Sequence, residues 1–189
     1  MKRLRNNIIS VIYSFIRFAL MKLLHGKRFS FHVIERFSPK TEVYFLGRKG
    51  IISLGKYVRA HSDCRFRVIG HGIIRIDTNA KFNYGCMITS RRRIHIGAGV
   101  EFGPNVLLYD HDHDFRAKGG LQADKYREGE IEIGENCWIG ANTVILRNTK
   151  LGRNCVVAAG CVLGNCSYPD NTIIYQKRDT QTKSFVTEP

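Results

Sequence analysis

Seven consecutive residues, Tyr109 to Phe115, bring two histidines and three aspartates together in one short run. Histidine can act as a general base near neutral pH, because its ordinary pKa is about 6.5. A neighbouring carboxylate can hold the imidazole in one tautomer and stabilise the imidazolium that forms. The run contains no serine or cysteine that could act as a nucleophile. The candidates Asp110, His111 and His113 therefore predict direct transfer to a weak nucleophile, such as a hydroxyl group, that a histidine deprotonates.

A six-residue repeat flanks this run and must position it. Aliphatic residues recur at every sixth position: Ile133, Ile139, Ile145, Leu151, Val157 and Leu163. Small residues stand four places after the first five of them: Cys137, Thr143, Thr149, Cys155 and Cys161. A helical period of about 3.6 would scatter the aliphatic residues around a cylinder, and simple alternation would not need the small residue. A fixed short period of this kind indicates a solenoid.

The repeat predicts a mainly β fold, a parallel β-helix in which three six-residue faces make one triangular turn. The register begins at Leu54, is broken near Val68–Gly72 and Thr89–His95, and stops at Leu108 until Ile133. We therefore expect a β-helix domain over residues 54–168 with an inserted loop over 109–130, which holds the histidines. Long loops on a rigid scaffold commonly carry function.

The N-terminal segment, residues 1–28, is basic and has apolar residues at helical spacing. Its longest uncharged run, Asn6 to Ile16, is shorter than the roughly 20 residues that cross a bilayer. We predict an amphipathic helix, which either lies in a membrane interface or caps the end of the solenoid. Residues 29–53 are expected to form a connection, and residues 169–189 a polar, basic C-terminal tail.

The formal net charge of +14 implies an anionic partner: a phosphate-bearing small molecule, nucleic acid or a membrane surface. The chain carries neither a recognition helix nor a zinc-finger motif, which disfavours nucleic acid. Five of the 6 cysteines occupy the small position of the repeat, so we expect reduced, structural thiols in a cytoplasmic protein.

The hexapeptide coils, the long histidine loop and the segment from Ile133 to Asn142 resemble the left-handed β-helix acyltransferases, in particular the branch that O-acetylates sugars and polysaccharides. The resemblance covers about residues 54–165. It implies a left-handed helix, a homotrimer, and acetyl-CoA bound between subunits. It further implies a loop histidine that deprotonates the acceptor hydroxyl. The segment Pro104-Asn105-Val106 points to His113, seven residues after the valine, with His111 as the alternative. Asp110, Asp112 and Asp114 are the candidates for the carboxylate that orients the imidazole.

The resemblance also assigns binding residues. It places Asn83 in the sugar pocket, although Gly85 stands where relatives have a second asparagine. Trp138 would lie at a corner near the acceptor channel, and Ala141 and Ala159 where CoA passes the coil. The lysine that relatives place near CoA phosphate is replaced, since those positions read Gly164 and Asn165. Three residues remain as phosphate contacts: Lys177, Arg178 and Lys183.

The expected function is therefore acetyl transfer from acetyl-CoA to a sugar hydroxyl of a surface polysaccharide or its lipid-linked precursor, in the cytoplasm or at the inner face of the membrane. An amino-sugar acceptor stays open. Two other functions remain as alternatives: a metal-dependent β-helix enzyme of the carbonic-anhydrase type, with His95 as a further ligand, and a non-enzymatic binder of anionic ligands. No metal is expected for acetyl transfer.

Overall fold

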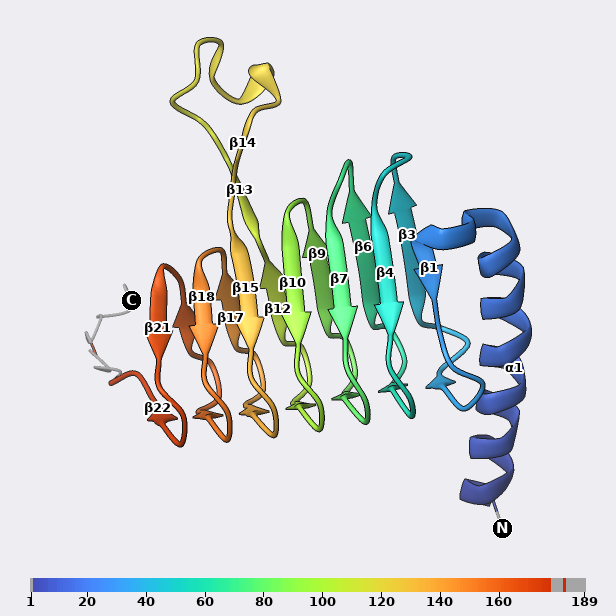
Figure 1. Ribbon diagram of the computed structural model, residues 1–189. Coiled ribbons are helices and arrows are strands. Elements are labelled where there is room, and N and C mark those ends of the chain that lie inside the picture. The colour runs from blue at the N-terminus through green and yellow to red at the C-terminus, as the bar shows by residue number, and fades with distance from the viewer. Residues whose placement is uncertain (1, 178–181, 183–189) are drawn as a thin grey trace, which may run out of the picture.

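The six-residue repeat folds with its aliphatic residues inside. In the computed structural model, which describes residues 2–177 and residue 182, the repeat aliphatics from Ile133 to Leu163 are at most 2% exposed. The small residues of the repeat are buried beside them. The chain thus winds into a three-sided prism of parallel strands, with one helix across its N-terminal end (Figure 1). The β-helix prediction is confirmed.

Each turn of the chain adds one strand to each face of the prism, here called faces A, B and C. Face A has seven strands: β1 (Phe29–Ser30), β4 (Ile51–Leu54), β7 (Ile73–Ile76), β10 (Arg93–Ile96), β15 (Glu130–Ile133), β18 (Thr149–Leu151) and β21 (Cys166–Tyr168). Face B has seven shorter strands: β2 (Arg36–Phe37), β5 (Arg59–Ala60), β8 (Lys81–Phe82), β11 (Glu101–Phe102), β16 (Trp138–Ile139), β19 (Val156–Val157) and β22 (Ile173–Ile174).

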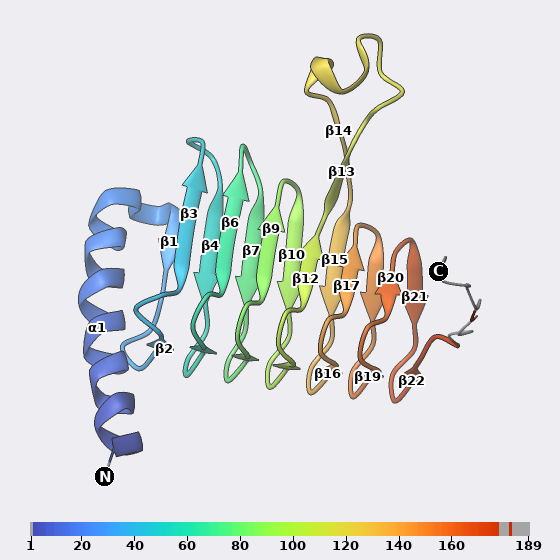
Figure 2. The ribbon, with the colours of Figure 1, turned by 180° about the vertical axis from the view of Figure 1, so that it is seen from behind.

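Face C has six strands: β3 (Glu42–Leu46), β6 (Arg65–Ile69), β9 (Met87–Ser90), β12 (Leu107–Tyr109), β17 (Val144–Leu146) and β20 (Val162–Leu163). A two-stranded antiparallel hairpin, β13 (His111–His113) and β14 (Tyr126–Glu128), interrupts the chain between faces C and A. Three helical segments complete the described chain: α1 (Lys2–His25), η1 (Gly26–Arg28) and η2 (Gly120–Ala123). Figure 2 shows the same arrangement from behind.

The solenoid begins one turn earlier than the sequence predicts. Residues 29–53, expected as a connection, supply β1, β2 and β3 and the start of β4, and each of these strands pairs with the next coil. At the other end β22 continues face B beyond residue 168. The first coil keeps the spacing of six through Phe31, Phe37 and Val43, but eleven positions separate Val43 from Leu54. This break in the register concealed the first coil.

Asparagine residues build many of the corners. Eight asparagines have positive φ angles between 51° and 62°: Asn79, Asn105, Asn136, Asn142, Asn148, Asn154, Asn165 and Asn171. Asparagine tolerates this left-handed conformation better than most residues, because its short polar side chain bonds locally. Some of these side chains bond to the next coil, as Asn154 does when its Nδ2 donates to Asn171 Oδ1 at 2.9 Å. The corners therefore stack in register.

A column of phenylalanines joins helix α1 to the first coils. The ring of Phe18 on α1 packs edge-on against Phe37 at 4.9 Å between centroids. Phe37 contacts Phe66, which in turn contacts Phe82 at 5.0 Å, and Phe82 stacks on Phe102 at 4.7 Å. Helix α1 thus closes the apolar end of the prism, as the end-cap alternative predicts.

All six cysteines are free thiols, and only Cys166 is not fully buried. This agrees with the expectation of reduced, structural thiols.

Glu35 is a buried carboxyl group in the turn between β1 and β2. Its Oε1 accepts a hydrogen bond from the His32 N–H at 3.3 Å, and its Oε2 has no partner among the described residues. Burial raises the pKa of Glu35 from its ordinary value of 4.5 to about 8. The side chain is therefore neutral in the folded protein at pH 7.

This shift predicts a pH-dependent stability. Between pH 4.5 and pH 8 the unfolded chain releases the Glu35 proton while the folded chain keeps it, so the free energy of unfolding falls as pH rises through this window. Glu35→Gln removes the effect. We expect the Tm difference between Glu35→Gln and wild type to move in favour of the variant from pH 5 to pH 8, measured by thermal melting. Glu42→Gln, which alters an exposed ion pair with Arg65, is the control and should show no such trend.

Candidate active site

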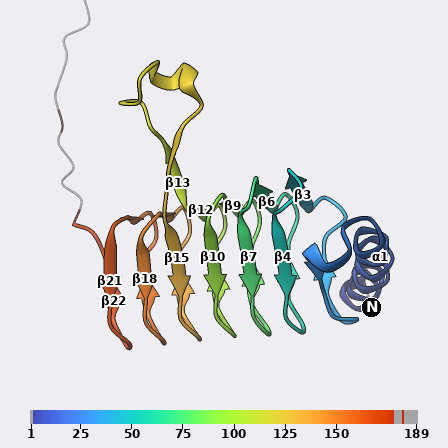
Figure 3. The same ribbon diagram turned by 45° about the horizontal axis from the view of Figure 1, so that its top comes forward.

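The loop that carries the histidines is a rigid hairpin at the edge between faces C and A. β13 and β14 pair antiparallel, with His111 opposite Glu128 and His113 opposite Tyr126. The Gly129 N–H donates to the Asp110 carbonyl at 2.8 Å and closes the base of the hairpin. Figures 1 and 3 show the hairpin standing out from the prism between β12 and β15. The inserted loop was correctly located from the sequence.

Asp110, at the base of the hairpin, is fully buried and accepts hydrogen bonds on both oxygens. Oδ1 accepts from the Arg91 N–H at 2.8 Å, and Oδ2 accepts from the Arg92 N–H at 2.9 Å and from the Ser90 hydroxyl at 2.6 Å. His111 Nδ1 lies 2.9 Å from Oδ1. An ionised carboxylate has about four acceptor sites, and here four donors surround it. Asp110 therefore fixes the β9–β10 corner and the histidine together.

His111 is largely buried above this carboxylate, with 10% of its side chain exposed. Because a carboxylate only accepts hydrogen bonds, the Nδ1 of His111 carries the hydrogen and Nε2 is left as the basic nitrogen. The ring packs edge-on between Tyr109 and Tyr126, at 6.1 and 5.7 Å between centroids. A base with a fixed tautomer and a neighbouring carboxylate is the arrangement that general-base catalysis requires.

His113 is two residues after His111 in β13, and its side chain is exposed. Its ring centroid is 4.6 Å from that of Tyr126. Alternate residues of a strand share a side, so His113 and His111 emerge on the same side of the hairpin. The sequence reasoning favoured His113 as the base, whereas the structure pairs the buried carboxylate with His111. Which of them is the base stays a prediction.

Three contacts that were not predicted hold the hairpin against the prism. The Arg91 guanidinium lies 3.3 Å from the centre of the Tyr126 ring, a cation–π contact. Arg147 Nε donates to Asp112 Oδ2 at 2.7 Å, and His71 Nε2 lies 3.1 Å from Glu128 Oε2. The one sequence signal was the run Arg91 to Arg93, which breaks the repeat at the level of the loop.

The other predicted site residues lie elsewhere on the prism. Asn83, Ala141 and Ala159 follow the face B strands β8, β16 and β19, so they share the edge between faces B and C. Trp138 is the first residue of β16 on face B, not a corner residue, and it is 59% exposed. One chain therefore does not bring these residues to His111, which lies across face C on another edge.

Backbone segments approach closely at the edge between faces B and C, as they do at the other two edges. A Cβ on Gly103 would lie 2.6 Å from Ala141 N, and a Cβ on Gly140 would lie 2.5 Å from Ala159 N. Such distances are too short for ordinary side chains, so only glycine fits at these two corners. At Gly103 and Gly140, and at the alanines next to them, the backbone is covered by little side-chain bulk, so a slender ligand can approach it closely.

The structure gives less support to His95 as a metal ligand and to the basic residues of the C-terminal tail as phosphate contacts. His95 Nε2 lies 2.9 Å from Asp77 Oδ2, so this histidine pairs within face A rather than approaching the loop. Within residues 2–177, no three His, Cys, Asp or Glu side chains converge as metal ligands. Lys177 is exposed after the last strand, and Arg178 and Lys183 lie outside the described residues.

Comparison with known proteins supports the same architecture. Residues 130–165 match the family model described as bacterial transferase hexapeptide (six repeats). Nodulation protein L of Rhizobium meliloti (strain 1021) is 33% identical over 76 residues, which are 39% of each chain. The match thus spans about two fifths of that relative.

Two solved structures share the fold. A mutant of AntD, an N-acyltransferase from Bacillus cereus, in complex with dTDP-4-amino-4,6-dideoxyglucose and coenzyme A, superposes with a TM-score of 0.66 at 19% identity over 88% of this chain and 90% of its own. A maltose O-acetyltransferase from Clostridium difficile 630 gives a TM-score of 0.51, also at 19% identity, over 88% and 83% of the two chains. Residues 130–165 thus match the hexapeptide family model, and the solved structures share the fold of this chain.

Proposed function

We propose that the protein is an acetyl-CoA-dependent O-acetyltransferase that acts on a sugar hydroxyl, with His111 as the general base. The observation that carries the proposal is the contact of His111 Nδ1 with the buried carboxylate of Asp110. The family match over residues 130–165 supports the class of transferase. Two of the similar proteins, named as a maltose O-acetyltransferase and a sugar-bound N-acyltransferase, act on or bind sugars, which supports a sugar acceptor.

The chain's own residues define the chemistry. Asp110 holds the Nδ1–H of His111, which leaves Nε2 to take the proton of the acceptor hydroxyl as its oxygen attacks. The thioester supplies an activated acyl carbon and a thiolate leaving group. His111 then returns the proton to the departing sulfur, and the fixed carboxylate stabilises the imidazolium between the two steps. The largely buried position of His111 limits competition from water.

The small residues at the edge between faces B and C fit the acyl donor. Ala141 and Ala159 leave the backbone between faces B and C accessible, as a narrow pantetheine arm would require. Because these residues and the hairpin occupy different edges of one prism, a site that uses both needs a second copy of the chain. We therefore propose a homotrimer in which the hairpin of one subunit meets the edge between faces B and C of its neighbour, with Trp138 and Asn83 beside the acceptor.

The acceptor class follows from charge and position. The net charge of +14 favours an anionic acceptor, such as a surface polysaccharide or its lipid-linked precursor. We place the enzyme in the cytoplasm, at the inner face of the membrane.

Acceptor-dependent release of CoA thiol tests the function. We expect the purified full-length protein and acetyl-CoA to release thiol only when sugars, nucleotide sugars or glycan fragments are added. Mass spectrometry should find an acetyl ester that mild alkali removes. An alkali-stable acetamide would instead show N-acetylation. Zinc in the purified protein together with hydration of carbon dioxide would support the metal-dependent alternative, and binding of anionic glycans without any turnover would support the non-enzymatic one.

A further inference from the structure

Helix α1 turns its more polar side toward the prism. Ser14 is buried, and its hydroxyl accepts from the Phe37 N–H at 2.9 Å and donates to the Ser10 carbonyl at 2.6 Å. Arg17 Nη1 donates to the Thr41 carbonyl, and Lys22 Nζ donates to the Phe29 carbonyl at 2.8 Å. Phe18 is the one large apolar side chain of α1 that is fully buried among the described residues.

The outer side of α1 is apolar. Leu23 and Leu24 are 81% and 79% exposed. Further large apolar residues of the helix are also exposed: Ile9, Phe15, Ile16 and Leu20. A helix that only capped the solenoid would bury this side, so the end-cap role does not account for it. Residues 1–28 contain seven Lys and Arg residues and neither Asp nor Glu, so the exposed side belongs to a cationic segment.

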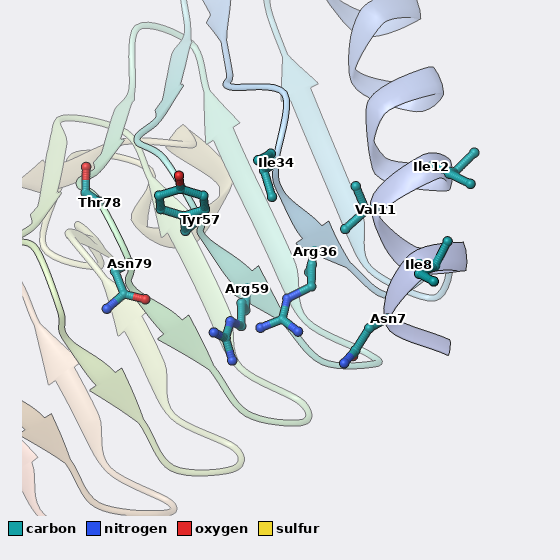
Figure 4. A pocket seen from close by; sticks show the side chains of 10 residues that line it. All are labelled: Asn7, Ile8, Val11, Ile12, Ile34, Arg36, Tyr57, Arg59, Thr78 and Asn79. Atoms are coloured by element: carbon teal, nitrogen blue, oxygen red, sulfur yellow. The ribbon is translucent and has the colours of Figure 1, made fainter. Parts of the chain in front are cut away.

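A groove opens between the N-terminal half of α1 and face B, with a volume of about 810 Å³ (Figure 4). Its lining includes Ile8, Val11 and Ile12 of the helix. In Figure 4, Val11 points toward Ile34, whereas Ile8 and Ile12 point to the other side of the helix. Ile8 and Ile12 are also half-exposed members of the outer side. The groove is therefore continuous with the exposed apolar surface of α1.

The floor of the groove is cationic. Arg36 and Arg59 are partners in adjacent parallel strands, so their side chains lie next to each other on face B. Two neighbouring guanidinium groups make the floor of the groove positively charged, which favours an anionic ligand. Burial and the charges of Arg36 and Arg59 also lower the pKa of His61.

We propose that α1 lies flat in the interface of an anionic membrane, and that the groove holds one anionic phospholipid. Arg36 and Arg59 bind its phosphate, and the acyl chain follows Ile8, Val11 and Ile12 to the outer side of the helix. This proposal concerns a site separate from the hairpin and does not rest on acetyl transfer.

A lipid surface fits the exposed side of α1 better than two other arrangements: a second copy of the chain packed on the helix, or a helix that crosses the membrane. A second copy of the chain would bring two cationic segments together, whereas an anionic bilayer offers each basic residue near its surface about 1 kcal/mol of attraction. Residues Asn7–Arg28 are long and apolar enough to cross a membrane, by length and composition alone. Crossing would pull Arg17 and Lys22 from their carbonyl partners and expose Phe18 together with the rings beneath it.

Co-sedimentation of the full-length protein with vesicles tests the proposal. We compare phosphatidylcholine vesicles with mixed phosphatidylcholine and phosphatidylglycerol vesicles. Wild type should bind only the mixed vesicles. Arg36→Gln with Arg59→Gln should weaken this binding by about tenfold to thirtyfold, since two charges near the surface are lost. Leu23→Ser with Leu24→Ser should weaken it as well, because the outer side of α1 enters the interface.

Lys150→Gln with Arg153→Gln is the matched control, since it removes two exposed charges near the opposite end of the prism. Thermal melting confirms that each variant is folded. An equal loss in the control and the groove variant would overturn the groove, as would unchanged binding of the groove variant. Displacement from vesicles by millimolar inorganic phosphate would show a free-phosphate site instead. Dimerisation through Leu23 and Leu24 without vesicle binding would overturn the membrane assignment.

Discussion

Replacing His111 by alanine is expected to lower kcat/KM for acyl transfer by about 100-fold to 10,000-fold, the usual contribution of a general base. The expectation rests on the buried carboxylate of Asp110, which fixes the tautomer of His111 at 2.9 Å. CoA thiol release, measured with the acceptor that gives the highest turnover, reports the loss directly. The Tm should change little, because the ring is not part of the solenoid core.

His113→Ala is the matched control. It removes the same kind of side chain from the same strand, two residues further along and on the same side. We expect a loss of less than about tenfold, since the buried carboxylate contacts His111 and the ring of His113 packs on Tyr126. A large loss in His113→Ala with an active His111→Ala would reverse the assignment. Full activity in both variants would remove the loop histidines from the mechanism.

Asp110→Ala should damage both stability and activity. The substitution leaves the buried N–H groups of Arg91 and Arg92 without acceptors, and each such group costs about 1–3 kcal/mol. A total of about 3–5 kcal/mol corresponds to a fall in Tm of about 10 °C for a chain of this size. The residual folded protein should also have lost transfer activity, because His111 no longer has a fixed tautomer. Thermal melting and the thiol assay measure the two effects separately.

Asp112→Ala provides the comparison for this variant. Asp112 is a half-exposed neighbour that pairs with Arg147 at the surface, and such pairs contribute about 0–1 kcal/mol. We expect its Tm to stay within about 3 °C of wild type. An Asp110→Ala protein that melts at the wild-type temperature would show that water or a shifted backbone replaces the carboxylate, and would contradict the role given to Asp110.

The solenoid could be predicted because its repeat is visible in the order of the residues alone. The residues from Ile133 to Leu163 keep a strict spacing of six, and every turn buries the same positions. The first coil was missed because the spacing of six is lost between Val43 and Leu54, which are eleven positions apart. Trp138 was wrongly assigned to a corner, because the residue before the buried aliphatic is the first strand residue in each neighbouring coil: Trp138 aligns with Glu101 and Val156.

The candidate site was only half predictable. Sequence located the loop and its titratable residues, but the distinction between His111 and His113 depends on which carboxylate is buried. That in turn depends on the amides of Arg91 and Arg92, which lie in the preceding turn and are distant in sequence. The groove beside α1 could not be predicted from the sequence for the same reason. Arg36 and Arg59 become neighbours only when one coil stacks on the next.

Helix α1 runs across the end of the prism, along the direction of the strands, so the coils stack away from its outer side (Figure 1). On face A, β1, β4, β7 and β10 separate the helix from the hairpin, and neighbouring strands are about 4.8 Å apart. With α1 flat on a bilayer, the solenoid holds His111 about 15–20 Å beyond the first coil, and the helix, about 10 Å across, adds to the distance from the lipid. An acceptor anchored in that bilayer must then extend its reactive sugar by the same length, so the number of coils below the hairpin selects how far from its lipid a glycan is modified.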